Sequence, residues 1–117
     1  MVNIYDKANE LAALLKQDET YLAYKKTKEE VYAEEANKKM IGDYKKLQFE
    51  AQAAMMSGQE PDAELMDKIQ KMGEVLQFNP KITEFFAAEY KFQTLMADLY
   101  KIIFADVSDF GETLAAE

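Results

Sequence analysis

The stretch that decides the fold runs from Asn79 to Phe104 and reads NPKITEFFAAEYKFQTLMADLYKIIF. Asn79 and Pro80 are typical of a helix start, because asparagine caps a helix and proline fits its first position. No glycine and no second proline occur within this stretch, so we expect one long helix. Its apolar residues cover more than one side, which indicates packing against several neighbours or against a second subunit. They are Ile82, Phe85, Phe86, Tyr90, Leu95, Met96, Leu99, Tyr100, Ile102, Ile103 and Phe104.

Four further helices are predicted upstream, from periodic apolar residues and from end signals. Their ranges are Ile4 to about Gln17, Glu19 to about Ala36, Asn37 to about Met56, and a helix after Pro61 that carries Leu65, Ile69, Met72 and Leu76. Asp18 is expected to cap the second helix. Asn37 is expected to mark a cap or a kink before the third, whose buried stripe is Met40, Tyr44, Leu47, Ala51 and Ala54.

The segment Ser57–Asp62 is the strongest loop signal, with a glycine suited to a helix end and a proline suited to the next first turn. So short a connection implies an antiparallel helical hairpin. Beyond Asp106 we expect a short amphipathic helix with Val107, Phe110 and Leu114, and residues 106–117 form an acidic tail that frays. The sequence therefore predicts an all-α, multi-helix bundle of about five helices plus a short C-terminal helix, in one domain over residues 1–117.

The composition excludes several functional classes. The 117 residues include no histidine, cysteine, arginine or tryptophan, so the usual catalytic triads and thiolate or imidazole metal sites cannot form. The net charge of −8 argues against direct binding of nucleic acid, which needs a basic surface. No apolar run approaches the ~20 residues of a membrane-spanning helix, and no export signal is visible at the start. A cytoplasmic protein without cofactor or metal is expected.

Acidic side chains offer the remaining route to catalysis. Glu30 and Glu34 share one helix face, as do Glu60 and Glu64, but lysines lie close to each pair and no apolar stripe surrounds it. We therefore expect solvated carboxylates and no enzyme. Methionine leaves two alternatives, core filling or an adaptable binding surface, and most of the seven methionines lie on the expected buried stripes. Met55 and Met56, beside the predicted loop, are the exception.

The aromatic side chains of the last long helix are the predicted self-association site. Their spread around the helix predicts a homodimer or a higher oligomer. The residues are Phe85, Phe86, Tyr90, Phe92, Met96 and Tyr100. The alternative function is a small-molecule or lipid binder that uses an apolar cavity between helices, beside Phe86 and Tyr90.

The order and spacing of short motifs over almost the whole chain resemble the YlbF/YmcA family of small helical bacterial regulators, and within it the YheA-type branch. The motifs are Asn3-Ile4-Tyr5-Asp6, Ala8-Asn9-Glu10-Leu11, Ala36-Asn37-Lys38-Lys39-Met40, Asp43-Tyr44, Gly58-Gln59-Glu60-Pro61, Ile82-Thr83-Glu84-Phe85-Phe86 and Leu99–Val107. The resemblance implies an all-helical fold, self-association and a non-enzymatic role as a regulatory adaptor.

In that family, YlbF and YmcA act with YaaT in competence, sporulation and biofilm development, and they associate with RNase Y in RNA processing. The resemblance thus implies other family members, or an RNA-processing complex, as partners. One feature separates this chain from them. Their complex is associated with iron–sulfur clusters, which need cysteine ligands, and this chain has none.

Overall fold

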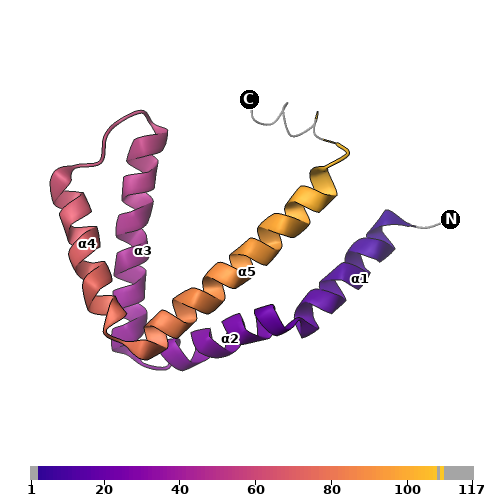
Figure 1. Cartoon of the computed structure of the whole chain (residues 1–117), viewed down its shortest axis with the longest axis horizontal. Helices are drawn as coiled ribbons and strands as arrows, with labels where there is room; N and C mark the ends of the chain where they lie inside the picture. Colours follow the sequence, from indigo (N-terminus) through magenta and orange to yellow (C-terminus); the bar gives the residue numbers. More distant parts are fainter. Residues whose placement is uncertain (1–2, 108, 110–117) are drawn as a thin grey trace. The chain divides into compact units, whose positions relative to one another are not determined.

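The computed structural model describes residues 3–107 and residue 109, and these residues form α-helices without any strand (Figure 1). The helices are α1 (Ile4–Gln17), α2 (Glu19–Tyr32), α3 (Glu35–Met56), α4 (Ala63–Gln77) and α5 (Pro80–Phe104). The prediction of an all-α, multi-helix protein is therefore confirmed. The predicted short C-terminal helix, with Phe110 and Leu114, lies outside the described residues.

Capping side chains set most of the helix starts where the sequence predicts them. Asp18 Oδ2 accepts hydrogen bonds from the backbone N–H groups of Thr20 at 2.9 Å and Tyr21 at 3.4 Å. Asn79 Oδ1 accepts in the same way from Lys81 at 3.1 Å and Ile82 at 3.4 Å. Each cap satisfies N–H groups that have no partner within the helix. Both α1 and α5 have the predicted bounds.

The break between α2 and α3 differs from the prediction. Helix α2 ends at Tyr32 instead of near Ala36, and Glu34 occupies the N-cap position of α3. Asn37 is neither a cap nor a kink, because it lies inside α3 and is buried. Its Nδ2 donates to Glu34 Oε2 at 3.0 Å, and its Oδ1 accepts from Asn79 Nδ2 at 3.3 Å. This tertiary hydrogen bond joins residues 42 positions apart, which local sequence cannot reveal.

The loop between α3 and α4 follows its predicted chemistry with one correction. Gly58 has a φ of 83°, a left-handed conformation that glycine adopts without steric cost. Asp62 caps α4, since its Oδ1 accepts from the backbone N–H of Glu64 at 3.2 Å. Pro61 therefore precedes the cap and does not lie in the first turn of α4. The two helices form the expected antiparallel hairpin (Figure 1).

The chain divides into two compact units, and each is described by itself. The hairpin unit comprises Lys25–Phe86, and the terminal unit comprises Met1–Tyr24 with Ala87–Glu117. Helices α2 and α5 each continue from one unit into the other. The assignment of residues 1–117 to one domain stays a prediction.

The hairpin unit holds a small apolar core to which each of its helices contributes. Its largest fully buried side chains are Val31 from α2, Ile41 from α3, Leu76 from α4, and Ile82 and Phe85 from α5. The ring of Phe85 lies 5.8 Å from that of Tyr32 in an edge-to-face contact. Lys45 Nζ lies 5.4 Å from the centre of the Phe85 ring, a favourable position for a cation over an aromatic face. The core therefore gathers around the start of α5.

The terminal unit is packed more openly. Helix α1 has no buried residue. Its contacts use Leu11 and Leu15, which are half-buried and line a shallow groove together with Leu95 and Leu99 of α5. Phe92 stacks on Tyr24 with ring centres 5.2 Å apart and lies 5.4 Å from Tyr21. Aromatic contacts between α2 and α5 thus contribute to the packing of this unit together with Leu11 and Leu15 of α1.

The double role of Asn79 makes it a test of the hairpin unit. Asn79→Ala removes both the cap of α5 and the donor to buried Asn37, so we expect the free energy of unfolding to fall by about 2 kcal/mol. Asn79→Asp keeps the capping oxygen and removes only the donor, so a loss of about 1 kcal/mol is expected. Urea unfolding at one fixed protein concentration measures both values. Wild-type stability of Asn79→Asp would show that the bond to Asn37 contributes nothing.

Candidate protein-docking surfaces

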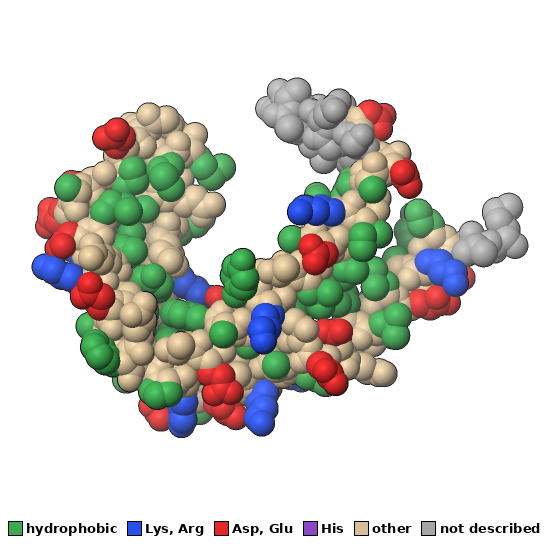
Figure 2. All heavy atoms as spheres, in the orientation of Figure 1, with side chains coloured by type: hydrophobic (Ala, Val, Ile, Leu, Met, Phe, Trp, Pro, Cys, Tyr) green, Lys and Arg blue, Asp and Glu red, His purple; other side chains and the backbone are tan. Residues whose placement is uncertain are grey.

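Large hydrophobic side chains are exposed in both units, and Figure 2 shows them on the surface in green. On α1, α3 and α4 they include Ile4, Tyr5, Leu14, Phe49, Met55, Met56, Met66 and Val75, and on α5 they include Tyr90, Met96, Tyr100, Ile102 and Ile103. Scattered apolar residues on a surface need no explanation, but groups of them mark interaction sites. Two groups stand out, one on α5 and one on the α3–α4 hairpin.

The structure separates the six predicted self-association residues into two kinds. Phe85 is 0% exposed and belongs to the core of the hairpin unit. Phe86 is half-buried beside Tyr44, with ring centres 6.1 Å apart, and Phe92 is half-buried against α2. Their side chains are largely used inside the fold. The other three are accessible: Tyr90 is 70%, Met96 41% and Tyr100 61% exposed.

Two of the accessible residues belong to a continuous stripe. Met96, Tyr100 and Ile103 follow one another at spacings of four and three, so they share one side of α5. Ile103 is exposed, and the Tyr100 ring lies 4.5 Å from the ring of Phe104. We call Met96, Tyr100 and Ile103 the α5 stripe. The apolar spacing of the α5 stripe is visible in the sequence. The sequence does not distinguish exposed Ile103 from the apolar residues on the buried sides of α5.

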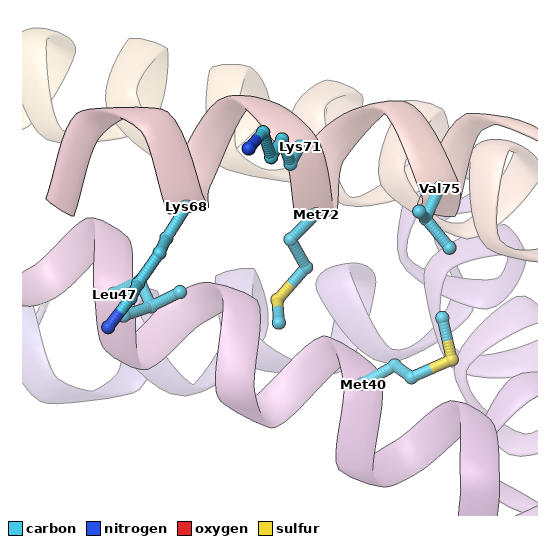
Figure 3. Close-up of a pocket in the computed structure, with 6 residues that line it drawn as sticks. All are labelled: Met40, Leu47, Lys68, Lys71, Met72 and Val75. Atoms are coloured by element: carbon cyan, nitrogen blue, oxygen red, sulfur yellow. The ribbon is translucent and has the colours of Figure 1, made fainter. Parts of the chain in front are cut away.

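A second apolar surface is an open groove of about 350 Å³ between α3 and α4. Its lining residues are Met40 and Leu47 from α3, and Lys68, Lys71, Met72 and Val75 from α4. Figure 3 shows Met72 pointing into the groove, Met40 and Val75 pointing toward each other, and Lys68 extending beside Leu47. The floor is apolar, and lysine supplies the charge. We call these six residues the hairpin groove.

The hairpin groove was not predicted as a site. Met40, Leu47 and Met72 lie on the stripes that the periodicity assigned to the interior, and they do face the partner helix. However, no further helix of the hairpin unit covers this side of the pair, so the groove stays open. Periodicity reports which side of a helix is apolar, but it cannot report whether that side is covered completely.

The methionines also differ from the expectation of core filling. Met40 and Met72 are half-buried in the hairpin groove, whereas Met55, Met56, Met66 and Met96 are exposed. Methionine fits irregular apolar surfaces because its unbranched side chain adapts to different partners. Met55, Met56, Met66 and Met96 therefore do not fill the core, and a binding role for them stays a prediction.

A smaller cavity lies beside Phe86, where the sequence suggested a ligand site. It measures about 220 Å³ and is lined by Tyr44, Gly73, Leu76, Gln77, Thr83 and Phe86, without Tyr90. Small-molecule sites usually occupy ~300–1,000 Å³. Thr83 Oγ1 already donates to the carbonyl oxygen of Asn79 at 3.2 Å. This cavity favours a small-molecule function less than the open apolar surfaces favour protein docking.

The described residues provide no obvious catalytic arrangement. Among them, no three carboxylates gather closely enough to hold a metal ion. Glu30, Glu34, Glu60 and Glu64 are all exposed. No helix within the described ranges is long and apolar enough to cross a membrane.

Comparison with known proteins places the chain among small helical bacterial proteins. The profile of one family, described as "Control of competence regulator ComK, YlbF/YmcA", matches residues 4–108. A "UPF0342 protein" of Caldicellulosiruptor bescii is 36% identical over 114 residues, which cover 97% of this chain and 95% of the relative.

Three solved structures share the fold. A protein of unknown function (DUF964) from Bacillus stearothermophilus gives a TM-score of 0.75 at 18% identity, covering 92% of this chain and 95% of that one. The yheA protein from Bacillus subtilis gives 0.65 at 26% identity, covering 93% and 99%. Bacillus subtilis RicA, solved in complex with RicF, gives 0.59 at 23% identity, covering 92% and 95%.

The division between buried and accessible aromatic residues on α5 can be measured. Phe85→Ala leaves a cavity in the hairpin core, so the free energy of unfolding should fall by about 3–5 kcal/mol. Tyr90→Ala removes an exposed ring and should change it by less than about 1 kcal/mol. Denaturant unfolding of both variants at equal concentration provides the comparison. A larger loss for Tyr90→Ala than for Phe85→Ala would contradict this assignment.

Proposed function

The chain belongs to the YlbF/YmcA family, and from that membership we propose that it is a non-enzymatic regulatory adaptor that binds other protein chains in the cytoplasm. The predicted resemblance to this family, including the YheA-type proteins, is thereby confirmed. The observation that carries the proposal is the amount of apolar side chain left exposed on α5 and on the α3–α4 hairpin. Exposed apolar surfaces of this kind favour a protein-binding function over a catalytic one.

The comparisons support the same class of function. The family description names a regulator of competence, and the RicA structure is a complex of RicA with RicF. RicA shares only the fold with this chain at 23% identity, so we take from it the general mode of action, which is contact between protein chains. Competence, sporulation, biofilm development and RNA processing with an RNase Y-type enzyme are the processes proposed by family resemblance.

Self-association is a further part of the proposal, and the α5 stripe is the surface proposed for it. Met96 and Tyr100 stay accessible, although Met96 also lines an open pocket together with Ala12 and Leu15 of α1. Tyrosine is enriched among residues that contribute most to binding, since its ring buries a large area and its hydroxyl can remain hydrated. Phe85 and Phe86 pack inside the hairpin unit and Phe92 packs against α2, so we do not include them in this surface.

Light scattering on the purified protein tests self-association through the α5 stripe. At micromolar concentration we expect a weight-average mass above the 13.4 kDa of one chain. Met96→Ser combined with Tyr100→Ser should raise the dissociation constant by about 30-fold, as expected when a central contact of about 2 kcal/mol is lost. Tyr5→Ser, which changes another exposed tyrosine on α1, is the matched control and should have little effect. A clean wild-type monomer would contradict self-association.

Affinity capture from the native cell, followed by mass spectrometry, tests the adaptor role. The proposal expects recovery of a YlbF-type protein or a ribonuclease at near-stoichiometric amounts, and at least a several-fold loss with the Met96 and Tyr100 substitutions. Tyr5→Ser serves again as the control. Recovery of this chain alone, at every bait concentration, would count against the adaptor role while leaving self-association intact.

A further inference from the structure

The cavity beside Phe86 is a part of the hairpin unit to which no role has been given so far. All six of its lining residues lie within Lys25–Phe86, and they come from α3, α4 and the start of α5. It shares no lining residue with the hairpin groove and is more enclosed than that groove. The cavity is therefore a separate candidate binding site.

Gly73 keeps this cavity open. A side chain at this position would begin with a Cβ only 3.3 Å from Tyr44 Oη, which is closer than most Cβ contacts in proteins. Glycine is an unfavourable residue in the interior of a helix, because it loses the most backbone entropy there. Helix α4 thus has glycine where a better helix former would press on Tyr44 and narrow the cavity.

The size of the cavity fits one aromatic ring. An apolar cavity of about 150 Å³ holds benzene, whereas drug-sized molecules occupy roughly 300–1,000 Å³. At about 220 Å³, this cavity has room for a benzene ring with a small substituent. Two of its walls are aromatic, since the rings of Tyr44 and Phe86 line it with their centres 6.1 Å apart. Aromatic walls favour an aromatic occupant.

Unused hydrogen-bonding groups belong to the same lining residues. The Tyr44 hydroxyl and the Gln77 side-chain amide form no hydrogen bond with any residue in the described part of the chain. Thr83 Oγ1 donates to the carbonyl oxygen of Asn79 at 3.2 Å and can still accept a hydrogen bond. An occupant with a hydroxyl group suits these partners, because a hydroxyl both donates and accepts. A purely apolar ring would displace their water without replacing its hydrogen bonds.

The residues that share the cavity's side of α3 and α4 carry no charge, although 31% of the chain is charged. At spacings of four, three and four they are Tyr44, Gln48, Ala51 and Met55 on α3, and Met66, Gln70, Gly73 and Gln77 on α4. Met55 and Met66 are exposed. Charged residues return next to this side, at Lys45, Glu74 and Glu84. Few charges, with methionine and aromatic residues, are typical of the centre of a protein interface, and charges are typical of its rim.

We propose that this cavity receives one tyrosine side chain of another protein and anchors that protein to the hairpin unit. Tyrosine combines a ring of the right size with the hydroxyl that Tyr44, Gln77 and Thr83 can bind. Phenylalanine has the ring without the hydroxyl, and aliphatic side chains have neither. Tyrosine is also enriched among the few residues that contribute most to binding in protein interfaces. The inference rests on the proposed adaptor role and names the side chain by which a partner is recognised.

Binding of p-cresol, which is the tyrosine side chain as a free molecule, tests the cavity on the full-length protein. An NMR titration should shift the backbone amides of Gly73, Gln77 and Thr83, with a dissociation constant on the order of 1 mM for so small a ligand. Toluene lacks only the hydroxyl and should bind about five-fold more weakly. Gln77→Leu should reduce this preference for p-cresol. Gln70→Leu, at an exposed glutamine of α4 outside the cavity lining, is the matched control and should keep it.

A pair of glycine variants closes the cavity or leaves it open. Gly73→Leu places a side chain against Tyr44 and should raise the dissociation constant of p-cresol at least ten-fold. Gly42→Leu makes the same change in α3, where no atom would lie within 4 Å of the new Cβ, and should leave binding unchanged. Urea unfolding confirms that both variants are folded.

The same two variants, used as baits in the capture experiment, identify the source of the ring. Gly73→Leu should lose, by about ten-fold, a partner that the wild-type and Gly42→Leu baits recover. Exchange of one tyrosine for phenylalanine in that partner should weaken its binding about five-fold, as for toluene against p-cresol. The mass of Gly73→Leu in light scattering should equal that of the wild type.

The remaining outcomes overturn the inference in different ways. Absence of p-cresol binding, or equal binding of toluene, would remove the tyrosine site, and the wild-type bait would still judge the adaptor role independently. Binding of p-cresol with the same partners on all baits would assign the cavity to a free phenolic molecule. A lower mass of Gly73→Leu would show that a second copy of this chain supplies the ring. A wild-type bait without any partner would contradict the adaptor role and this inference together.

Discussion

The hairpin unit depends on one cluster of contacts, in which α5 begins against the ends of α2, α3 and α4. Phe85 and Ile82 are buried together with Val31, Ile41 and Leu76, and the hydrogen bond from Asn79 to Asn37 lies beside them. Dispersion and the hydrophobic effect stabilise this small core but have no preferred direction. The hydrogen bond of the Asn79 side-chain amide, in contrast, requires a defined distance and angle to its acceptor. The asparagine pair therefore gives the cluster a register, and the hairpin extends outward from it.

A core so small leaves much of the chain's apolar surface uncovered, and this surplus connects structure with function. The chain has 49% hydrophobic residues, yet only seven hydrophobic residues of the described part are buried. Apolar area that stays exposed to water does not contribute to the folding free energy of the single chain. Burying that area against another chain is favourable, so it stabilises an association. A protein that docks onto others can place its hydrophobic residues in just this way. The α5 stripe and the hairpin groove are the two places where this surplus is organised instead of scattered.

Much of the fold could be predicted because its signals are local. The bounds of α1 and α5, the caps at Asp18 and Asn79 and the left-handed Gly58 all follow from backbone groups that need a nearby partner or a permitted φ. The site could be predicted only in part. Helical periodicity identified apolar residues on α5, but burial of Phe85 and exposure of Tyr90 depend on which neighbours reach each side. The hairpin groove was not predicted, because helical periodicity assigned its apolar residues to the interior of the protein.

The sequence by itself determined the helical class, the ends of α1 and α5, and the absence of histidine and cysteine chemistry. Each of these depends on residue type or on partners within a few positions along the chain. Only the tertiary structure decided that Asn37 accepts a hydrogen bond from Asn79, that Phe85 is core while Tyr90 is surface, and that the α3–α4 flank stays open. The physical reason is that the burial of a side chain depends on the residues that surround it in space, and these residues are far apart in the sequence.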